Sequence, residues 1–273
     1  MGVLIFLVVH WYASLFFQSF FHHRYAAHRI CSMTPFWEKV FYVCCFITQG
    51  SSYISARTYG IMHRMHHAHT DTEQDPHSPA NSENVLTMMV DTRNNYIGIH
   101  TGKIPVDDKY KKDLPTWLAF DKLVHNWMVR TAWGLAYLGI YIWLACDTWW
   151  LYLFLPITLA MGSVQGVAVN WWAHKFGYRN YNVKDTSTNI LPVDVIFWGE
   201  AYHNNHHRNP GRSNNAVRWF EVDFLYLAMR GMHAVGIIKL KRPSAPAKLS
   251  YVPVKQRGTV AVKDVPAETE PIW

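Results

Sequence analysis

The chain has 273 residues, of which half are hydrophobic and only 16% are charged. An ordinary soluble domain carries roughly 25% charged residues. This shortage of charge, together with 13 tryptophans and 15 tyrosines, favours a membrane protein with aromatic residues at its interfaces. The net charge of +7 is carried largely by the last third of the chain, which is typical of a cytoplasmic segment beside anionic lipid, or of a docking face for an acidic electron carrier or a phosphate-bearing substrate. A chain this apolar is not expected to bind nucleic acid.

The first apolar stretch covers residues 3–21 and is long enough to cross about 30 Å of hydrocarbon. No basic residue precedes it and no clear small-residue cleavage site follows it, so we expect a membrane span rather than a secretory signal. Arg24 and Arg29 come directly after the stretch. They predict that this end of the helix lies in the cytoplasm.

Two further apolar blocks follow, at residues 36–55 and 131–172. The later block is interrupted at residues 146–148, which predicts a helical hairpin with arms at 131–145 and 149–171. Pro156 is expected to kink the second arm. Residues 71–122 are polar and rich in turn residues, so we expect them outside the membrane. We expect one membrane domain over residues 1–242 and a disordered tail over 243–273, where prolines, lysines and acids alternate without periodicity.

The four cysteines, Cys31, Cys44, Cys45 and Cys146, show no Cys-x-x-Cys spacing. Two of them are adjacent, which suits neither a disulfide framework nor a zinc knuckle. We therefore expect reduced cysteines, either buried or within the membrane.

Nine of the 16 histidines fall into four short clusters. The clusters are His23 with His28; His63, His66 and His67; His174, four residues after Asn170; and His203, His206 and His207. Residues three and four apart lie on one face of a helix, so each His-x-x-His-His cluster presents three imidazoles together. Three such imidazoles cannot all serve one metal without ligands from elsewhere, so we expect two metals to share the nine nitrogens. Imidazole suits iron, copper, zinc or nickel; open positions for dioxygen and the absence of cysteine ligands favour iron.

The other histidines and four acids are assigned lesser roles. His10, His100, His125 and His233 are expected to be ordinary core residues, and His22, His69 and His77 to form hydrogen bonds beside the clusters. Asp71, Asp75, Asp185 and Glu200 are expected either to accept hydrogen bonds from ligand imidazoles or to cap helices.

The histidines also constrain the membrane topology. If residues 36–55 crossed the membrane completely, His23 and His28 would lie on the opposite side from His63, and the clusters could not share metals. We therefore predict that this stretch dips into the membrane or lies along its interface. Three spans then remain, with the N-terminus outside and the C-terminus in the cytoplasm.

The clusters and their flanking residues resemble the membrane fatty acyl desaturases of the acyl-CoA Δ9 type. That family has the boxes His-x4-His, His-x-x-His-His and His-x-x-His-His, which fall here on the first, second and last clusters. The flanking residues agree at Thr70-Asp71, at Asp75-Pro76-His77, and through residues 199–207. The sequence departs from the family in having one span before the first box where some members have two, and in Ala201, where glycine is common.

The resemblance implies an all-α fold, an integral-membrane helical bundle whose cytoplasmic helical cap holds a histidine-rich di-iron site. It implies that all nine clustered histidines bind two iron ions, that His174 is the ninth ligand, and that Asn170 completes the shell through a water. Dioxygen would be the co-substrate and a long-chain fatty acyl group the substrate. Because no cytochrome b5-like haem motif is present, electrons would come from a separate protein such as a cytochrome b5, ferredoxin or rubredoxin.

Two other functions use similar residues. A membrane di-iron hydroxylase of a lipid or alkane would return oxygen to its substrate, although the Asn204-Asn205 and Asp75-Pro76-His77 contexts favour desaturation. A histidine-rich metal transporter or sensor would place its ligands along a path through the bilayer. The expected function is therefore oxygen-dependent formation of a cis double bond, at the Δ9 position of an acyl-CoA by the resemblance.

Overall fold

The computed structural model describes residues 1–145 and 148–241. Helices dominate it, in the order α1 (Gly2–Phe17), η1 (Gln18–Ala27), α2 (Pro35–Gln49), η2 (Gly50–Ser52), α3 (Ala56–His69), η3 (Pro79–Asn81), α4 (Val85–His100), η4 (Asp108–Lys111), α5 (Leu118–Val124), α6 (Trp127–Ala145), η5 (Trp149–Phe154), α7 (Leu155–Leu159), α8 (Met161–Trp172), α9 (His203–Arg208) and α10 (Phe224–Ala234). The expected tail at 243–273 and most of the expected break at 146–148 lie outside the described residues.

Polar side chains fix where several helices begin. Thr34, Ser55, Asn84 and Asp223 each accept a hydrogen bond from a backbone N–H in the first turn of α2, α3, α4 and α10, respectively. Such caps satisfy N–H groups that have no partner within the helix. Helix α4 lies inside the segment expected to be polar and rich in turns, where no helix was predicted.

Two short strands correct the all-α expectation. Strand β1 (Cys31–Met33) pairs antiparallel with β2 (Ile238–Leu240), with Cys31 opposite Leu240. This pairing ties the segment after η1 to the end of the described chain. Strands of three residues carry too little periodicity to be recognised in a sequence.

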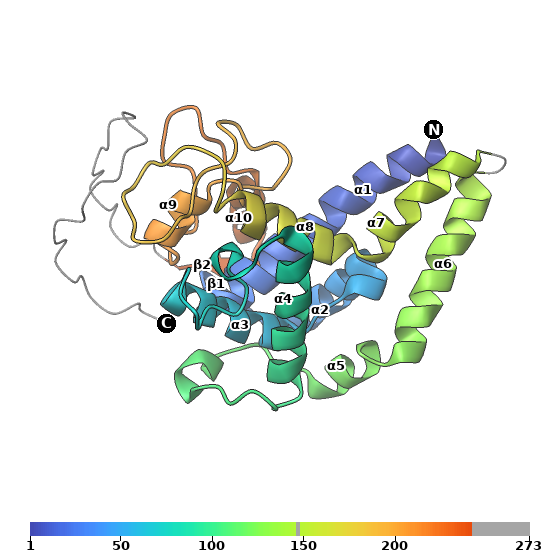
Figure 1. Cartoon of the computed structure of the whole chain (residues 1–273), viewed down its shortest axis with the longest axis horizontal. Coiled ribbons are helices and arrows are strands. Elements are labelled where there is room, and N and C mark those ends of the chain that lie inside the picture. Colours follow the sequence, from blue (N-terminus) through green and yellow to red (C-terminus); the bar gives the residue numbers. More distant parts are fainter. Residues whose placement is uncertain (146–147, 242–273) are drawn as a thin grey trace.

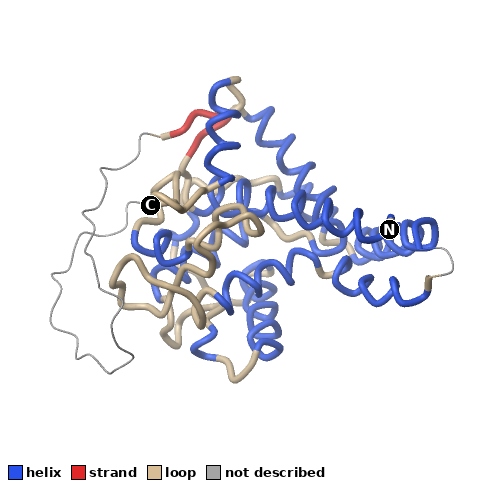
Figure 2. The backbone as a smooth tube through the Cα atoms, turned by 90° about the horizontal axis from the view of Figure 1, so that it is seen from above, coloured by secondary structure: helices blue, strands red, loops and turns tan. Residues whose placement is uncertain are grey.

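The main hydrophobic core lies where η1 crosses α2 and α3. Phe20 and Phe21 of η1 are fully buried and their rings pack against Phe41 of α2. A separate cluster joins the start of α1 to the end of α6 and η5 through Val3, Tyr141 and Leu151. The start of α1, α6 and α7 thus form an arm at one end of the molecule, and α9 with its surrounding loops lies at the other (Figures 1 and 2).

Among the described residues, one helix is long and apolar enough to cross a membrane, the continuous α1–η1 helix from Gly2 to Ala27. Helix α2 has 15 residues and spans about 22 Å, less than the ~30 Å of hydrocarbon in a bilayer. The pair Trp149–Leu159 and Met161–Trp172 passes the same test only if it is taken as one bent span.

The bend in this pair is 70° and lies at Ala160, between α7 and α8, so the prediction of a kink at Pro156 is wrong. Pro156 stands in the first turn of α7, where its missing N–H would have no helical partner in any case. The proline therefore marks the start of a helix rather than a kink within one.

Candidate metal centre

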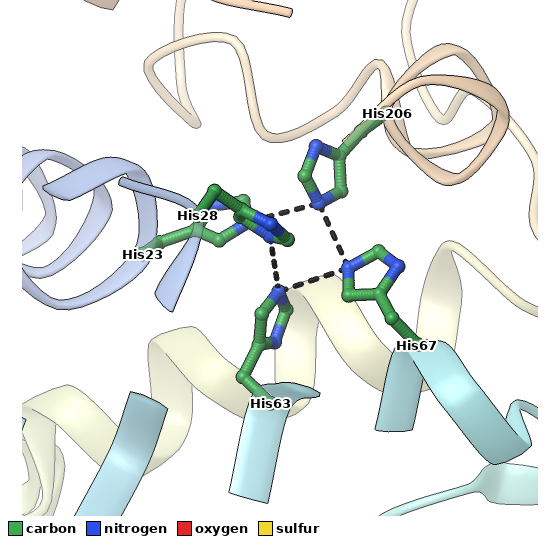
Figure 3. A group of neighbouring side chains, drawn as sticks. All are labelled: His23, His28, His63, His67 and His206. Atoms are coloured by element: carbon green, nitrogen blue, oxygen red, sulfur yellow. Dashed lines mark hydrogen bonds between the residues drawn. The ribbon is translucent and has the colours of Figure 1, made fainter. Parts of the chain in front are cut away.

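The nine clustered histidines lie together in two groups, each with its ligand nitrogens within 4.8 Å of one another. The first group contains His23, His28, His63, His67 and His206 (Figure 3), and the second contains His66, His174, His203 and His207. Within the second group, the Nε2 atoms of His66 and His207 lie 3.3 Å apart. The structure thus brings together every histidine that the sequence motifs selected; their binding of metal stays a prediction.

Helices α3 and α9 each contribute to both groups. On α3, His63 and His67 are four residues apart and face the first group, whereas His66 faces the second. On α9, His206 faces the first group and His203 and His207 face the second. The box on α3 therefore gives two histidines to the first group and one to the second, whereas the box on α9 gives one to the first and two to the second. Each box connects the two groups.

The first box depends on an unusual helix. His23 and His28 are five residues apart, a spacing that would place them on different faces of an α-helix. Residues Gln18–Ala27 instead form a π-helix, and the N–H of His28 donates to the carbonyl of His23, 3.1 Å away. A hydrogen bond between residues five apart is the π-helical pattern. It brings both imidazoles to the first group.

Carboxylates hold several imidazoles from behind. His23 Nδ1 lies 2.7 Å from Glu200, His66 Nδ1 lies 2.8 Å from Asp75, and His207 Nδ1 lies 3.1 Å from Asp185. His174 Nδ1 contacts the Thr186 hydroxyl at 3.1 Å, and Asp71 accepts hydrogen bonds from that same residue. Of the two roles expected for these acids, the structure therefore shows imidazole support and not helix capping.

These contacts leave Nε2 free to bind a cation. A neutral imidazole has one N–H, so donation from Nδ1 to a carboxylate leaves a lone pair on Nε2. His66 and His207 both donate from Nδ1, and their Nε2 atoms face each other at 3.3 Å. Two facing lone pairs repel each other unless a cation lies between them, so the donor set fits a metal ion.

The spacing in the first group favours more than four ligands. Its Nε2 atoms are 2.9 Å apart for His23 and His206, 3.0 Å for His206 and His67, and 3.0 Å for His67 and His63. With metal–nitrogen bonds of about 2.1 Å, ligands at right angles lie about 3.0 Å apart, and tetrahedral ligands about 3.4 Å. Five donors at the shorter spacing do not fit a structural zinc site, which is tetrahedral.

Burial keeps these histidines in the form that binds metal. It lowers the pKa of His28, His63, His67, His203 and His206 well below the usual value and that of His207 to about 4. Burial alone would raise the pKa of Asp75, but the interactions with His66 and His77 together outweigh it and the pKa falls to about 2. Neutral imidazoles supported by ionised carboxylates are good metal ligands.

Asn170 belongs to neither histidine group, but it lies next to them. It lines a cavity of 40 Å³ together with His23, His63 and His203. A water molecule needs about 10–15 Å³ of such space. Leu15, Tyr59 and Val169 also line the cavity. Apolar side chains and members of both histidine groups therefore border the same space.

The remaining histidines lie outside both groups. His10 and His22 contact the backbone carbonyls of Thr48 and Ile54, and His69 contacts the Tyr110 hydroxyl. His100 and His125 stack on each other 4.2 Å apart, and His233 contacts the carbonyl of Ile238. His77 differs from these, because its ring stacks on His66 at 4.2 Å and neither ring nitrogen has a hydrogen-bond partner among the described residues.

Two supporting features escaped the sequence reasoning. The buried Arg24 contacts Glu200 at 3.6 Å and Asp223 at 3.0 Å, and so fixes the carboxylate that holds His23. The side-chain amides of Asn204 and Asn205 form hydrogen bonds with the surrounding loops. A charged residue inside the first box was a signal for Arg24; nothing in the sequence pointed to Asp223 as its partner.

The fold and the two histidine groups define a class of protein, a helical protein with a candidate dinuclear, histidine-ligated metal centre. The chain belongs to the fatty acid desaturase family, whose family model matches residues 1–235. It is 28% identical over 225 residues to the sn-1 stearoyl-lipid 9-desaturase of Anabaena variabilis, covering 79% of this chain and 74% of that protein. It is 27% identical over 243 residues to the Delta-9 acyl-lipid desaturase 1 of Arabidopsis thaliana, covering 85% of this chain and 73% of that protein.

These comparisons confirm the predicted membership of the Δ9 desaturase family and make the protein an oxidoreductase of fatty acid metabolism. The acyl-CoA type is not confirmed, because the relatives are named for acyl groups carried on lipids.

Proposed function

We propose that the protein introduces a cis double bond at the Δ9 position of a long-chain fatty acyl group, using dioxygen and two iron ions. The observation that carries the proposal is the arrangement of nine buried or half-buried histidines in groups of five and four. Iron held there would supply the oxygen chemistry needed to remove hydrogen from an unactivated methylene, which no protein side chain can do.

The chain's own residues would orient the metal ligands, hold a water and position the acyl chain. Glu200, Asp75 and Asp185 hold three imidazoles in the tautomer that presents Nε2. Asn170 would complete the second group through a water in the cavity that it shares with His203. The apolar side of that cavity, at Leu15 and Val169, would hold one pair of carbons of the acyl chain beside the metals.

The most specific part of the proposal is the molecule that carries the acyl group. The histidine boxes led to an acyl-CoA, whereas both relatives described above are named for acyl lipids. We propose a glycerolipid-bound acyl chain on the strength of these relatives. A fatty acyl chain still attached to a membrane lipid would reach the site laterally, which suits a protein anchored by the apolar helix Gly2–Ala27.

The proposal includes a multi-pass membrane protein with its active site on the cytoplasmic face and an external electron donor of the cytochrome b5, ferredoxin or rubredoxin type. The apolar helix and the bent pair support membrane insertion. A transporter is disfavoured, because the ligands gather at one place instead of following a path through the bilayer.

The test is expression in a host that makes no unsaturated fatty acids. Mass spectrometry of the lipids should find acyl chains that are lighter by two hydrogens, with the double bond at Δ9. Gain of one oxygen would identify a hydroxylase instead. A His206→Ala strain should make no product, and a His233→Ala strain should retain most of it, because His233 lies outside both groups.

The carrier can be tested with membranes that contain the protein. Isotope-labelled stearoyl-CoA and a phospholipid with a labelled stearoyl group are supplied separately, with acyl transfer blocked. Desaturation of the phospholipid alone supports the glycerolipid carrier, and desaturation of the coenzyme A ester alone would restore the acyl-CoA assignment.

A further inference from the structure

A polar cavity of 280 Å³ is lined by Asp75 and His77, which both contact His66 of the second histidine group. Its walls come from the turn after α3, from η3 and from one side of α4. Polar and acidic side chains dominate the lining, which includes Glu73, Asp75, His77, Asn81, Asp91 and Asn95. Glu73 and Asp91 are exposed, so this cavity faces solvent at its carboxylates.

His77 stands at the inner wall of this cavity. It is 4% exposed, and neither of its ring nitrogens has a hydrogen-bond partner in the part of the chain that the structure describes. Buried polar atoms are nearly always paired, so two unpaired nitrogens on one buried ring point to a ligand. The ligand atoms of His77, His66 and Asp75 lie within 4.8 Å of one another, a spacing that could hold a metal ion.

Asp75 is already occupied within this trio. Its carboxylate accepts from His66 Nδ1 and from the backbone N–H groups of Asp71 and His77. The other donors that line the cavity include the His77 nitrogens, which are unpaired among the described residues, and the exposed carboxylates of Glu73 and Asp91. Imidazole with carboxylate is a donor set that binds ferrous iron, and weak sites of this kind release it again.

We propose that this cavity is a loading site for ferrous iron, through which the ion passes from solvent to the second histidine group by way of His77. The His77 ring stacks on that of His66, a member of that group, at a centroid distance of 4.2 Å. The carboxylates at the mouth attract cations and raise their local concentration. The inference rests on the proposed di-iron centre and adds the route by which one of its two positions is filled.

The test follows iron uptake and needs no desaturase activity. Full-length protein in detergent is stripped with a chelator, ferrous iron is added without oxygen, and iron bound per chain is measured over time. His77→Gln should slow the filling of one of the two positions by about tenfold or more. Its final iron content should match that of the unaltered protein. His69→Gln is the matched control, because His69 lies on α3 and contacts Tyr110 away from the cavity; it should load normally.

A second variant tests the same route in case His77→Gln does not fold. Glu73→Gln combined with Asp91→Asn changes only exposed carboxylates and should also slow uptake. Uptake at the normal rate in both variants would overturn the loading site. A permanent loss of one iron in His77→Gln, without slower filling of the rest, would also overturn it, since His77 would then support the bound metal. Failure of the unaltered protein to bind two irons would instead refute the di-iron centre itself.

Discussion

The imidazoles of the two groups differ in what holds them from behind. His23, His66 and His207 donate to carboxylates, whereas the Nδ1 atoms of His203 and His206 are buried without a hydrogen-bond partner in residues 1–145 and 148–241. A carboxylate behind an imidazole raises its basicity and fixes its orientation. We therefore expect the carboxylate-backed histidines to set the strength of metal binding, and the others to complete the geometry.

Asp185 offers the clearest test of this idea, because it is the only carboxylate in contact with His207 Nδ1 among the described residues. Asp185→Asn keeps the size of the side chain and weakens its acceptor. Metal affinity at the second group should fall by about 10- to 100-fold. Competition with a chelator of known affinity measures the change. Asp108→Asn removes an exposed carboxylate that contacts Lys111 and should leave the affinity unaltered; equal affinities in the two variants would refute the role of Asp185.

At the scale of residues, the sequence indicated which histidines form the site but not how they divide between the two groups. Six of the nine members of the two groups stand at i, i+3 and i+4 in the two His-x-x-His-His boxes, a pattern that is visible in the sequence. His23 and His28 are five residues apart, and His174 was expected as a ligand from the family resemblance. The division into five and four depends on how α3 and α9 face each other, which no local spacing contains. The same holds for Arg24 and Asp223, whose contact joins residues 199 positions apart.

Helix α9 carries three of the nine histidines and is only six residues long. A helix this short is not stable by itself in water. Asn204 and Asn205 hold it in place. Asn204 bonds the backbone of Asn180, Tyr181 and Ser187, and Asn205 bonds Asn180 and the carbonyl of Asn215. The asparagines between the histidines of the last box are thus structural anchors.

Loss of one anchor should therefore destabilise the protein. Asn205→Ala removes several buried hydrogen bonds, among them the one to the Asn215 carbonyl, which should cost about 1–3 kcal/mol of the free energy of unfolding. Thermal unfolding in detergent, with iron removed, measures the effect. Asn209→Ala at the end of the same helix replaces a half-buried asparagine and should change stability by about 0.5 kcal/mol or less. A smaller loss in Asn205→Ala than in Asn209→Ala would contradict the anchoring role.

At the scale of elements, long apolar patterns were predictable and local backbone geometry was not. The stretches at 3–21 and 131–145 coincide with α1–η1 and α6. The π-helical segment that brings His23 to His28 packs against α2 and α3, and its sequence alone does not distinguish it from an α-helix. Helix α4 escaped prediction because its buried residues, such as Met88 and Tyr96, are too sparse to form a clear apolar face.

The whole molecule brings the first and second histidine clusters to one place even though an apolar helix separates them. Helix α2 packs against α1, returns the chain to the level of η1, and delivers α3 to the first group. A helix of 15 residues is too short to take the chain to the far side of a bilayer. The expectation that residues 36–55 do not form a full span agrees with this geometry; their position relative to lipid stays a prediction.

Accessibility in membranes tests that position. Single cysteines at the exposed positions Ser32 and Asn94, in a background without native cysteines, should react with an impermeant reagent from the same, cytoplasmic side. A cysteine at the exposed Trp149, the first residue of η5, which packs against the start of α1, should react from the opposite side. Reaction of the first two positions from opposite sides would refute the proposed topology, and with it a shared metal centre.

The most direct test of the central claim is the metal content of the purified full-length protein. Elemental analysis by mass spectrometry, referred to protein concentration from amino-acid analysis, counts iron, zinc and copper in one sample. The five- and four-histidine groups predict about two iron ions per chain and little of the other metals. One metal ion per chain, or two zinc ions in active protein, would contradict the di-iron account.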